Sequence, residues 1–315
     1  MRPFFWPPMR LRITGALPLL LPLTVSAAAL LAAACGGNGD TADGRVKVVT
    51  TLPLFADMVR QVGGDRVDVS ALLPAGADPH TFEPAPRDVQ SVATASIALG
   101  NGLGLEPGAD KIIEANLKSG AQYVKLAEKA QEQGVQVIDD NPHLWLDIDA
   151  AKTYAAGIRD SLVQVDPAGA SAYGRNYDAY AATLAELSQY ARQKVASIPA
   201  GNRKLVTTHD AFPYLARYLG LEIVAFAEEG PGQESGPGAI ASLTRALEDQ
   251  HVPAVFTEPQ IGGANKVLEQ AAQDAGVRVC TLYSDSLDDK VRSYADLIRF
   301  DVDELARCLG PGSNA

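Results

Sequence analysis

Short runs of β-branched and other apolar residues alternate with longer segments of helical periodicity from residue 46 onward. In the longer segments, apolar positions recur every three or four residues, which is the spacing of one helix face. This alternation is typical of parallel α/β sheets, in which each helix returns the chain to the next strand. We therefore predict strands at 46–51, 67–73, 97–99, 135–138, 204–206, 222–226, 254–257 and 277–283. Helices are predicted at 54–63, 86–95, 149–162, 239–250, 265–275 and 294–309.

One further helix is longer than the others and divides the α/β pattern into two halves. Asp166-Pro167 offers a hydrogen-bond acceptor at the N-cap and a proline at the first helical position, and Pro199 ends the segment. An apolar stripe runs between them through Tyr173, Tyr177, Tyr180, Leu184, Leu187, Ala191 and Val195. The predicted organisation is an N-terminal α/β domain at 46–165, a linking helix at 166–199 and a C-terminal α/β domain at 200–315. At ~1.5 Å per residue, the linking helix would be about 45 Å long.

The first 34 residues have the pattern of a secretory signal peptide. Three arginines precede an uncharged stretch rich in Leu and Ala, which ends in Ala32-Ala33-Ala34-Cys35. A Cys directly after small residues resembles a bacterial lipobox, in which the thiol is acylated and becomes the first residue of the mature chain. The alternatives are an ordinary cleavage site with an incidental Cys35, and a membrane anchor, for which the basic stop-transfer flank is missing. We predict a signal peptide at 1–34, lipidation of Cys35 and a flexible tether at 35–45.

Composition and charge narrow the classes of function. The 315-residue chain carries a net charge of -11 and has a pI near 4.9, which argues against nucleic acid as a partner because phosphates require a basic surface. The lipid anchor would hold the protein outside the cytoplasmic membrane, at the cell surface or in the periplasm. Because that compartment is oxidising, Cys280 and Cys308 can form a disulfide, and the alternative is two buried thiols.

Three of the four histidines and one aspartate lie near the ends of predicted strands. His80 and Asp285 each follow a strand, His209 follows a strand directly, and His143 precedes a helix, so we place all four on strand-to-helix connections. Ligands of open parallel sheets bind at the carboxyl ends of the strands, and each predicted domain contributes two of these residues. Three imidazoles and one carboxylate form a ligand set that suits Zn²⁺, whereas Mn²⁺ prefers more oxygen. His251 lies in a turn at the opposite end and is expected to be exposed.

The motifs around these residues resemble those of a known family. They read Gly-Ala-Asp-Pro-His at 76–80, Pro-His-Leu-Trp-Leu-Asp at 142–147, Thr-His-Asp-Ala-Phe at 208–212 and Tyr-Ser-Asp at 283–285. In order and spacing they are similar to the ligand motifs of cluster A-I, the metal-binding solute receptors of zinc and manganese ABC importers. The resemblance implies two α/β domains joined by a backbone helix, with one metal ion per chain buried at the interface. It implies the ligands His80, His143, His209 and Asp285.

The resemblance also points to the zinc branch of that family. The manganese branch typically has Glu where His209 stands, and a Cys280–Cys308 disulfide also fits zinc receptors. The segment 128–141 contains no His, so the chain resembles the subgroup without a His-rich loop before the second ligand. The implied partners are an ABC permease and its ATPase, and a secreted zinc metallochaperone is a further hypothesis. We expect a monomer that binds zinc less tightly below about pH 6, where histidine is protonated.

Three other functions remain as alternatives. One is a manganese receptor of the same fold, another is a secreted zinc-dependent hydrolase, and the third is an adhesin. A catalytic zinc site keeps one coordination position open for water, whereas four protein ligands close the site, so we do not expect an enzyme. Glu83, Asp210 and Glu258 lie near the predicted ligands in sequence, and we assign them supporting roles because a ligating His needs a partner on its other nitrogen.

Overall fold

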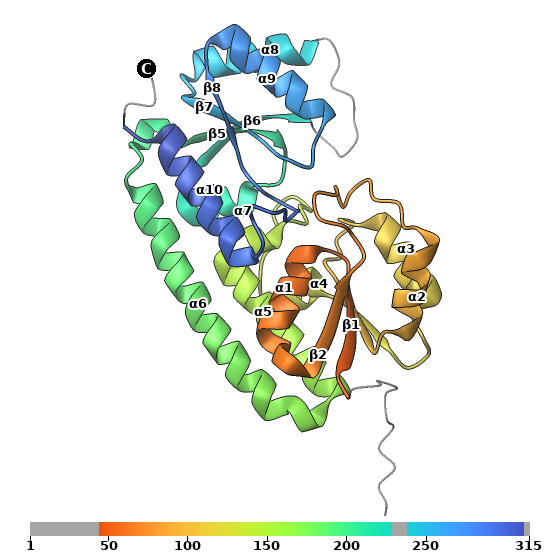
Figure 1. The fold of residues 1–315 in the computed structure, drawn as a ribbon. Coiled ribbons are helices and arrows are strands. Elements are labelled where there is room, and N and C mark those ends of the chain that lie inside the picture. The colour runs from red at the N-terminus through yellow and green to blue at the C-terminus, as the bar shows by residue number, and fades with distance from the viewer. Residues whose placement is uncertain (1–43, 229–237, 312–315) are drawn as a thin grey trace, which may run out of the picture. The chain divides into compact units, whose positions relative to one another are not determined.

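The computed structural model of the protein describes residues 44–228 and 238–311. The predicted signal peptide at 1–34, Cys35 and the tether up to residue 43 lie outside the described residues. Two lobes, each built on a four-stranded parallel sheet, make up the described chain (Figure 1). The predicted fold class, two parallel-sheet βα domains with a long backbone helix, is confirmed.

The first lobe contains the strands β1 to β4 in the order β2-β1-β3-β4. They span Val46–Thr50, Val67–Ala71, Ile97–Gly100 and Gln122–Lys125. The helices of this lobe are α1 Pro53–Gly63, α2 Pro86–Thr94, α3 Pro107–Asn116, α4 Leu126–Glu132 and α5 Ile148–Val165. All four residues of β3 are buried, as expected for an inner strand of a sheet with helices on both faces.

The second lobe repeats this plan with the strand order β6-β5-β7-β8. Its strands are β5 Lys204–His209, β6 Glu222–Glu228, β7 Ala254–Thr257 and β8 Arg278–Thr281. Its helices are α7 Pro213–Leu219, α8 Gly238–Asp249, α9 Gly263–Ala275 and α10 Tyr294–Leu309. The inner strand β7 is buried throughout, which explains the continuous apolar run that predicted a strand at 254–257.

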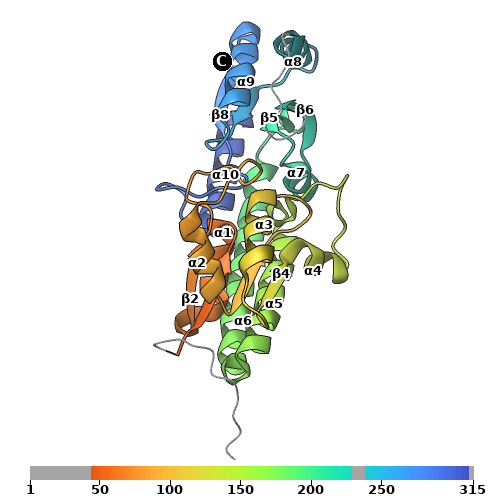
Figure 2. The same cartoon turned by 90° about the vertical axis from the view of Figure 1, so that its right-hand side faces the viewer.

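Helix α6, Ala170–Ala196, runs beside both lobes (Figures 1 and 2). It contacts α1 and α5 of the first lobe, and α7 and α10 of the second. The predicted apolar stripe faces these neighbours, with Tyr177 half-buried and the other six residues buried. The helix therefore joins the lobes through one continuous row of core side chains.

The predicted start of this helix is wrong in detail. Pro167–Gly169 forms a separate 3₁₀ turn, and the α-helix begins only at Ala170. The Asp166 carboxylate does not cap the helix, because Arg66 lies 2.7 Å from it and the Tyr173 hydroxyl donates to it at 2.7 Å. The Asp166 carboxylate, which the local sequence suggests as a helix cap, is therefore used in an ion pair with Arg66 instead.

The predicted strand at 135–138 is also wrong. This segment has no regular structure, and the fourth strand of the first sheet is β4 at Gln122–Lys125. The apolar residues Val135, Val137 and Ile138 are half-buried against the core, which explains their apolar pattern without a strand. The edge strand β4 buries only Val124, so its sequence lacks the apolar run of an inner strand.

The second lobe contains the predicted disulfide. Cys280 in β8 is bonded to Cys308 in α10, with an S–S distance of 1.99 Å. It joins the edge strand of the second sheet to the last helix, which contacts both α6 and α1. Within the described residues, no helix has both the length and the apolar character needed to span a bilayer.

Candidate metal centre

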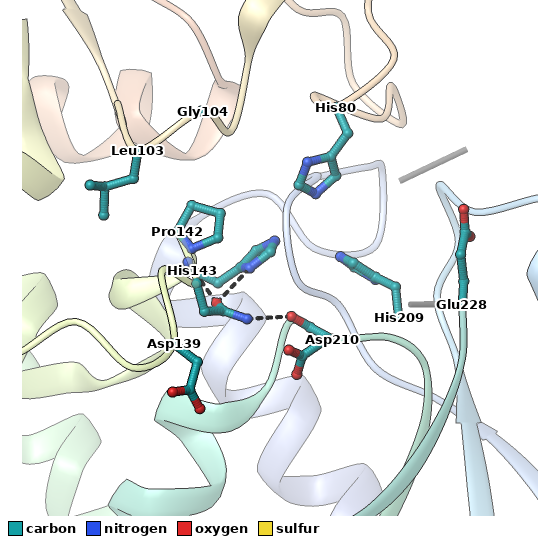
Figure 3. Close-up of a pocket in the computed structure, with 10 residues that line it drawn as sticks. His80, Leu103, Gly104, Asp139, Pro142, His143, His209, Asp210 and Glu228 are labelled. Carbon is teal, nitrogen blue, oxygen red and sulfur yellow. Dashed lines mark hydrogen bonds between the residues drawn. The ribbon is translucent and has the colours of Figure 1, made fainter. Parts of the chain in front are cut away.

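The four residues predicted as ligands come together between the two lobes. His80 lies on the loop between β2 and α2, and His143 directly precedes the 3₁₀ turn Leu144–Leu146. His209 is the last residue of β5, and Asp285 follows β8. One nitrogen or carboxylate oxygen from each residue lies within 4.8 Å of those from the other three. The rings of His80, His143 and His209 face a common space (Figure 3).

One placement differs from the sequence-based expectation. Because 135–138 is not a strand, His143 lies on the connection between helices α4 and α5, and not after a strand. It still reaches the site because the connection crosses to the second lobe, where the Tyr214 hydroxyl accepts a hydrogen bond from the Ile138 N–H at 3.0 Å. The other three residues lie on connections that follow strands, as predicted: His209 ends β5, and His80 and Asp285 lie on the loops after β2 and β8.

The spacing of the four side chains suits a small cation. Asp285 Oδ1 is 3.3 Å from His143 Nε2, and Asp285 Oδ2 is 3.6 Å from His209 Nε2 and 3.9 Å from His80 Nε2. Two ligands of a tetrahedral zinc ion with bonds of ~2.0–2.1 Å would be about 3.3–3.4 Å apart. The observed separations are therefore close to those of a metal site and longer than most N–H···O hydrogen bonds.

The atoms that face this space are buried without hydrogen-bond partners. They are His80 Nε2, His143 Nε2, His209 Nε2 and Asp285 Oδ1. The residues His143, His209 and Asp285 are only 1%, 5% and 1% exposed. Buried polar atoms without partners are costly and rare in folded proteins. A cation bound between them would give all four atoms a partner.

The imidazole of His209 is oriented by a buried carboxyl group. Glu258 Oε1 accepts from the Nδ1–H of His209 at 2.8 Å and lies 3.3 Å from its backbone N–H. The other oxygen, Oε2, accepts from the Ser284 hydroxyl at 2.5 Å, directly beside Asp285. Glu258 therefore fixes His209 with Nε2 free and ties it to the loop that carries Asp285. This arrangement agrees with the supporting role predicted for Glu258.

The imidazole of His143 is oriented by a neighbouring amide. Asn141 Oδ1 accepts from the backbone N–H of His143 at 3.1 Å and from its Nδ1–H at 2.9 Å. At the first ligand, Asp78 Oδ1 accepts from the backbone N–H of His80 at 3.0 Å. In both loops the acceptor stands two residues before the histidine, with proline between them.

An aromatic residue ties the His143 segment to the loop of Asp285. The indole N–H of Trp145 donates to the carbonyl oxygen of Ser284 at 2.9 Å, and the Tyr294 hydroxyl donates to the carbonyl oxygen of Trp145 at 2.7 Å. The Trp145 ring lies 5.3 Å from the ring of His143, measured between centroids. Hydrogen bonds to backbone carbonyl groups thus connect Trp145 of the first lobe with the loop of Asp285 and with α10 of the second lobe.

The site has uneven proton affinities in the absence of metal. Burial, together with the facing His209, lowers the pKa of His80 to about 4, and burial lowers the pKa of His143 well below its usual value. Burial also opposes a charge on His209, but Glu258 and Asp285 outweigh it and raise the pKa of His209 to about 9. Burial raises the pKa of Asp285 to about 7. The raised pKa favours the protonated form of His209 at neutral pH, and a cation that binds this imidazole would displace the proton.

A pocket of about 240 Å³ leads to the three histidines. Its lining includes Leu103 from the first lobe and three acidic residues, Asp139, Asp210 and Glu228 (Figure 3). Leu103 and Asp139 both have positive φ values, 54° and 46°, which non-glycine residues adopt rarely. The carboxyl groups in its lining give the pocket a charge that favours a cation.

Of the other residues that the sequence placed near the site, Asp210 contacts it and Glu83 does not. Asp210 contributes through its backbone carbonyl group, which accepts from Asn141, and its side chain lines the pocket. Glu83 is exposed and makes none of the site contacts described above, so its predicted supporting role is not seen. His251 is exposed at the turn before β7, as predicted. Sequence reasoning missed Asn141, although the repeated Asx-Pro-His pattern at 78–80 and 141–143 could have indicated it.

Comparison with known proteins places this site in a family. The sequence matches the profile of ZnuA, described as zinc-uptake complex component A periplasmic, over residues 48–308. The manganese-binding lipoprotein MntA of Halalkalibacterium halodurans is 30% identical over 89% of this chain and 95% of MntA. The manganese ABC transporter substrate-binding lipoprotein PsaA of Streptococcus anginosus is 28% identical over 92% of this chain and 97% of PsaA.

Solved structures give the same result. The periplasmic zinc binding protein TroA from Treponema pallidum aligns with a TM-score of 0.77 and 27% identity, covering 85% of this chain and 100% of TroA. The Mn-bound periplasmic metal binding protein from Candidatus Liberibacter asiaticus aligns with a TM-score of 0.74 and 25% identity, covering 84% and 99%. PsaA is named as the substrate-binding lipoprotein of an ABC transporter, and the matched profile as a component of a zinc-uptake complex. The chain therefore belongs to the cluster A-I family of metal-binding solute receptors of ABC importers, the family of zinc-uptake complex component A.

Proposed function

We propose that this protein is an extracytoplasmic zinc receptor that binds one Zn²⁺ per chain and delivers it to the permease of an ABC importer. The proposed ligands are His80, His143, His209 and Asp285. The observation that carries the proposal is the convergence of four buried ligand atoms that have no hydrogen-bond partner. The ion is the cargo of the receptor, so the site must bind it and later release it.

The donor set supports zinc over manganese. Three imidazole nitrogens and one carboxylate oxygen are a common set for Zn²⁺, whereas Mn²⁺ is found with more oxygen ligands. The N–O separations of 3.3–3.9 Å also suit a four-coordinate ion. With the carboxyl group of Glu258 hydrogen-bonded to His209, two acidic side chains accompany a divalent charge in this buried space.

Manganese is the second candidate, because MntA and PsaA are named as manganese-binding proteins. Affinity alone does not distinguish the two metals, since almost any site of nitrogen and oxygen ligands holds Zn²⁺ more tightly than Mn²⁺. The number and geometry of the ligands do distinguish them. A zinc receptor offers a closed tetrahedral site, and a manganese receptor accepts additional oxygen ligands.

The test therefore combines stoichiometry with coordination geometry. Purified protein is stripped with a chelator, reloaded with Zn²⁺ and analysed for metal content, with one zinc per chain expected. The same protein is loaded with Co²⁺, whose visible absorption spectrum is intense in a tetrahedral site and weak in an octahedral one. We expect the intense spectrum. A stoichiometry near zero would contradict the proposal as a whole, and a weak, octahedral spectrum would transfer the assignment to manganese.

We also propose how the receptor is attached and organised. The proposed precursor has a signal peptide at 1–34, and the mature chain carries a lipid on Cys35 with a tether to residue 45. The proposed domains are 46–165 and 200–315, with the linking segment 166–199 between them. The names of MntA and PsaA as lipoproteins support the anchor, and the Cys280–Cys308 disulfide supports an oxidising compartment. Mass spectrometry of the wild type and of Cys35→Ser from membranes tests this, with acylation expected only in the wild type.

A further inference from the structure

A single amide side chain connects a proposed ligand of one lobe with the backbone of the other. Asn141 is 7% exposed and belongs to the connection between α4 and α5. Its Oδ1 accepts from the backbone N–H and the ring Nδ1–H of His143, at 3.1 and 2.9 Å. Its Nδ2 donates at 2.5 Å to the carbonyl oxygen of Asp210, the residue after His209. Dashed lines in Figure 3 mark the bonds to His143 and Asp210.

Backbone groups at both ends fix which side of the Asn141 amide donates and which side accepts. The carbonyl oxygen of Asp210 can only accept, so the group of Asn141 that faces it must be the amide NH₂. The backbone N–H of His143 can only donate, so the group that faces it must be Oδ1. Oδ1 in turn requires that Nδ1 of His143 carries the proton. The free lone pair then lies on Nε2, the nitrogen that faces the site without a hydrogen-bond partner.

We propose that Asn141 is a positioning residue that sets the tautomer of His143 and makes it depend on contact between the two lobes. The proposal rests on the proposed function, because the tautomer matters only if Nε2 is a ligand. His209 provides the contrast, since its orienting acceptor, Glu258, belongs to the same lobe. The acceptor of His209 therefore does not depend on the other lobe, whereas the acceptor of His143 is held in part by Asp210 of the second lobe.

This arrangement gives the importer a means of releasing the ion. If docking on the permease separates Asn141 from Asp210, the amide loses the bond that holds its NH₂ group at the second lobe, and only the backbone N–H of His143 still opposes a rotation that presents NH₂ to the ring. An amide donor facing Nδ1 favours the tautomer that carries its proton on Nε2, and a protonated nitrogen cannot bind a metal. A separation of the lobes at this one contact would therefore weaken one of the four metal bonds without unfolding either lobe.

The inference can be tested on metal-free protein by NMR of the histidine side chains. The chain has only four histidines, and long-range ¹H–¹⁵N correlation spectra distinguish an imidazole with the proton on Nδ1 from one with the proton on Nε2. We expect His143 to have its proton on Nδ1 in the wild type and to lose this preference in Asn141→Ala. In Asn141→Asp, the carboxylate still accepts from His143 but cannot donate to Asp210, so the Nδ1–H tautomer should be retained.

Tyr214→Phe is the matched control. The Tyr214 hydroxyl accepts from the N–H of Ile138 at 3.0 Å and donates to the carbonyl oxygen of Asn141 at 2.7 Å. Its removal takes away two other hydrogen bonds between the lobes but leaves the Asn141–Asp210 bond and the partner of the His143 ring in place. Thermal unfolding and circular dichroism of each variant show how much of the fold is retained. The control should keep the wild-type tautomer even if its melting temperature falls.

Zinc affinity is the second measurement, made by competition with a chromophoric chelator. Asn141→Ala should weaken binding on the order of 10- to 100-fold, the usual effect of removing the partner of a ligating histidine. Asn141→Asp should weaken it less, and Tyr214→Phe least. An unchanged His143 tautomer in Asn141→Ala, or an equal loss of the tautomer in Tyr214→Phe, would overturn the proposal. If the wild type binds no zinc, the proposed function fails, but the tautomer measurement still decides the role of Asn141.

Discussion

The pH dependence of zinc binding that the structure predicts differs from the one that the sequence predicts. Histidine has an ordinary pKa near 6.5, so the sequence predicts that zinc binding weakens only below about pH 6. In the structure the pKa of His209 is raised to about 9 by Glu258 and Asp285, despite the opposing effect of burial. A raised pKa means that the metal-free protein keeps this proton throughout the neutral range. A zinc ion that binds through His209 would have to displace this proton, so we expect binding to strengthen as the pH rises toward 9.

The size of the effect follows from proton linkage. Each pH unit below the pKa of a ligand that must lose one proton lowers the apparent affinity about tenfold, or about 1.4 kcal/mol. Between pH 9 and pH 7 the proton on His209 alone would weaken zinc binding about 100-fold. Below pH 7, protonation of Asp285, whose pKa is raised to about 7, should make the dependence steeper. The pKa values of His80 and His143 are lowered, so these two ligands should not contribute in this range.

Isothermal titration calorimetry of zinc binding, in buffers with different ionisation enthalpies, measures the number of protons released. At pH 8 we expect about one proton per zinc ion. Glu258→Gln keeps a hydrogen-bond acceptor for His209 but removes the carboxyl group that raises its pKa, so proton release at pH 8 should fall toward zero. Release near zero in the wild type, or an affinity that does not change between pH 7 and pH 9, would refute the assignment of the proton to His209.

Other consequences can be checked with simpler experiments. His209→Ala should weaken zinc binding on the order of 100-fold or more, and an unchanged dissociation constant in a competition titration would exclude His209 as a ligand. His209→Glu should weaken the tetrahedral Co²⁺ spectrum, because a second carboxylate favours metals with higher coordination numbers; an unaltered spectrum would contradict this. Replacing both Cys280 and Cys308 by Ser should lower stability by about 3–4 kcal/mol for the 28-residue separation, measured by denaturant unfolding, without changing zinc stoichiometry. Chelation should lower the melting temperature of the wild type, and no shift would mean that metal does not bind the folded state preferentially.

The sequence predicted the inner parts of the fold better than its edges. Strands such as β3 and β7 are buried on both faces, so their composition alone identifies them. The edge strand β4 buries only one residue, so its sequence has a weak strand pattern. The segment 135–138 has a stronger apolar pattern and was predicted as a strand, although it has no regular structure. The start of α6 was misplaced because the Asp166 carboxylate is used by Arg66, a partner 100 residues away that no local pattern reveals.

The site shows the same division between local and distant information. The four proposed ligands stand out in the sequence because histidines are few and lie in motifs that resemble those of a known family. The partners of their second nitrogens do not stand out, since Glu258 and His209 are 49 residues apart. The raised pKa of His209 depends on charge and burial in three dimensions, and no sequence pattern gives it. Asn141 lies only two residues before His143 in the sequence, but its bonding partner Asp210 is 69 residues away and could be found only in the fold.

The position of Trp145 gives this protein a built-in optical reporter. The chain contains two tryptophans, and the other, Trp6, lies in the predicted signal peptide, so the mature receptor would carry Trp145 alone. Its ring is 5.3 Å from that of His143, and its N–H is bonded to the backbone next to Asp285. An indole so close to two ligands responds to a change of charge at the site. Its fluorescence emission should therefore follow metal uptake and release in the unlabelled protein. The same signal can be recorded in the presence of the importer, after the emission of the importer alone is subtracted.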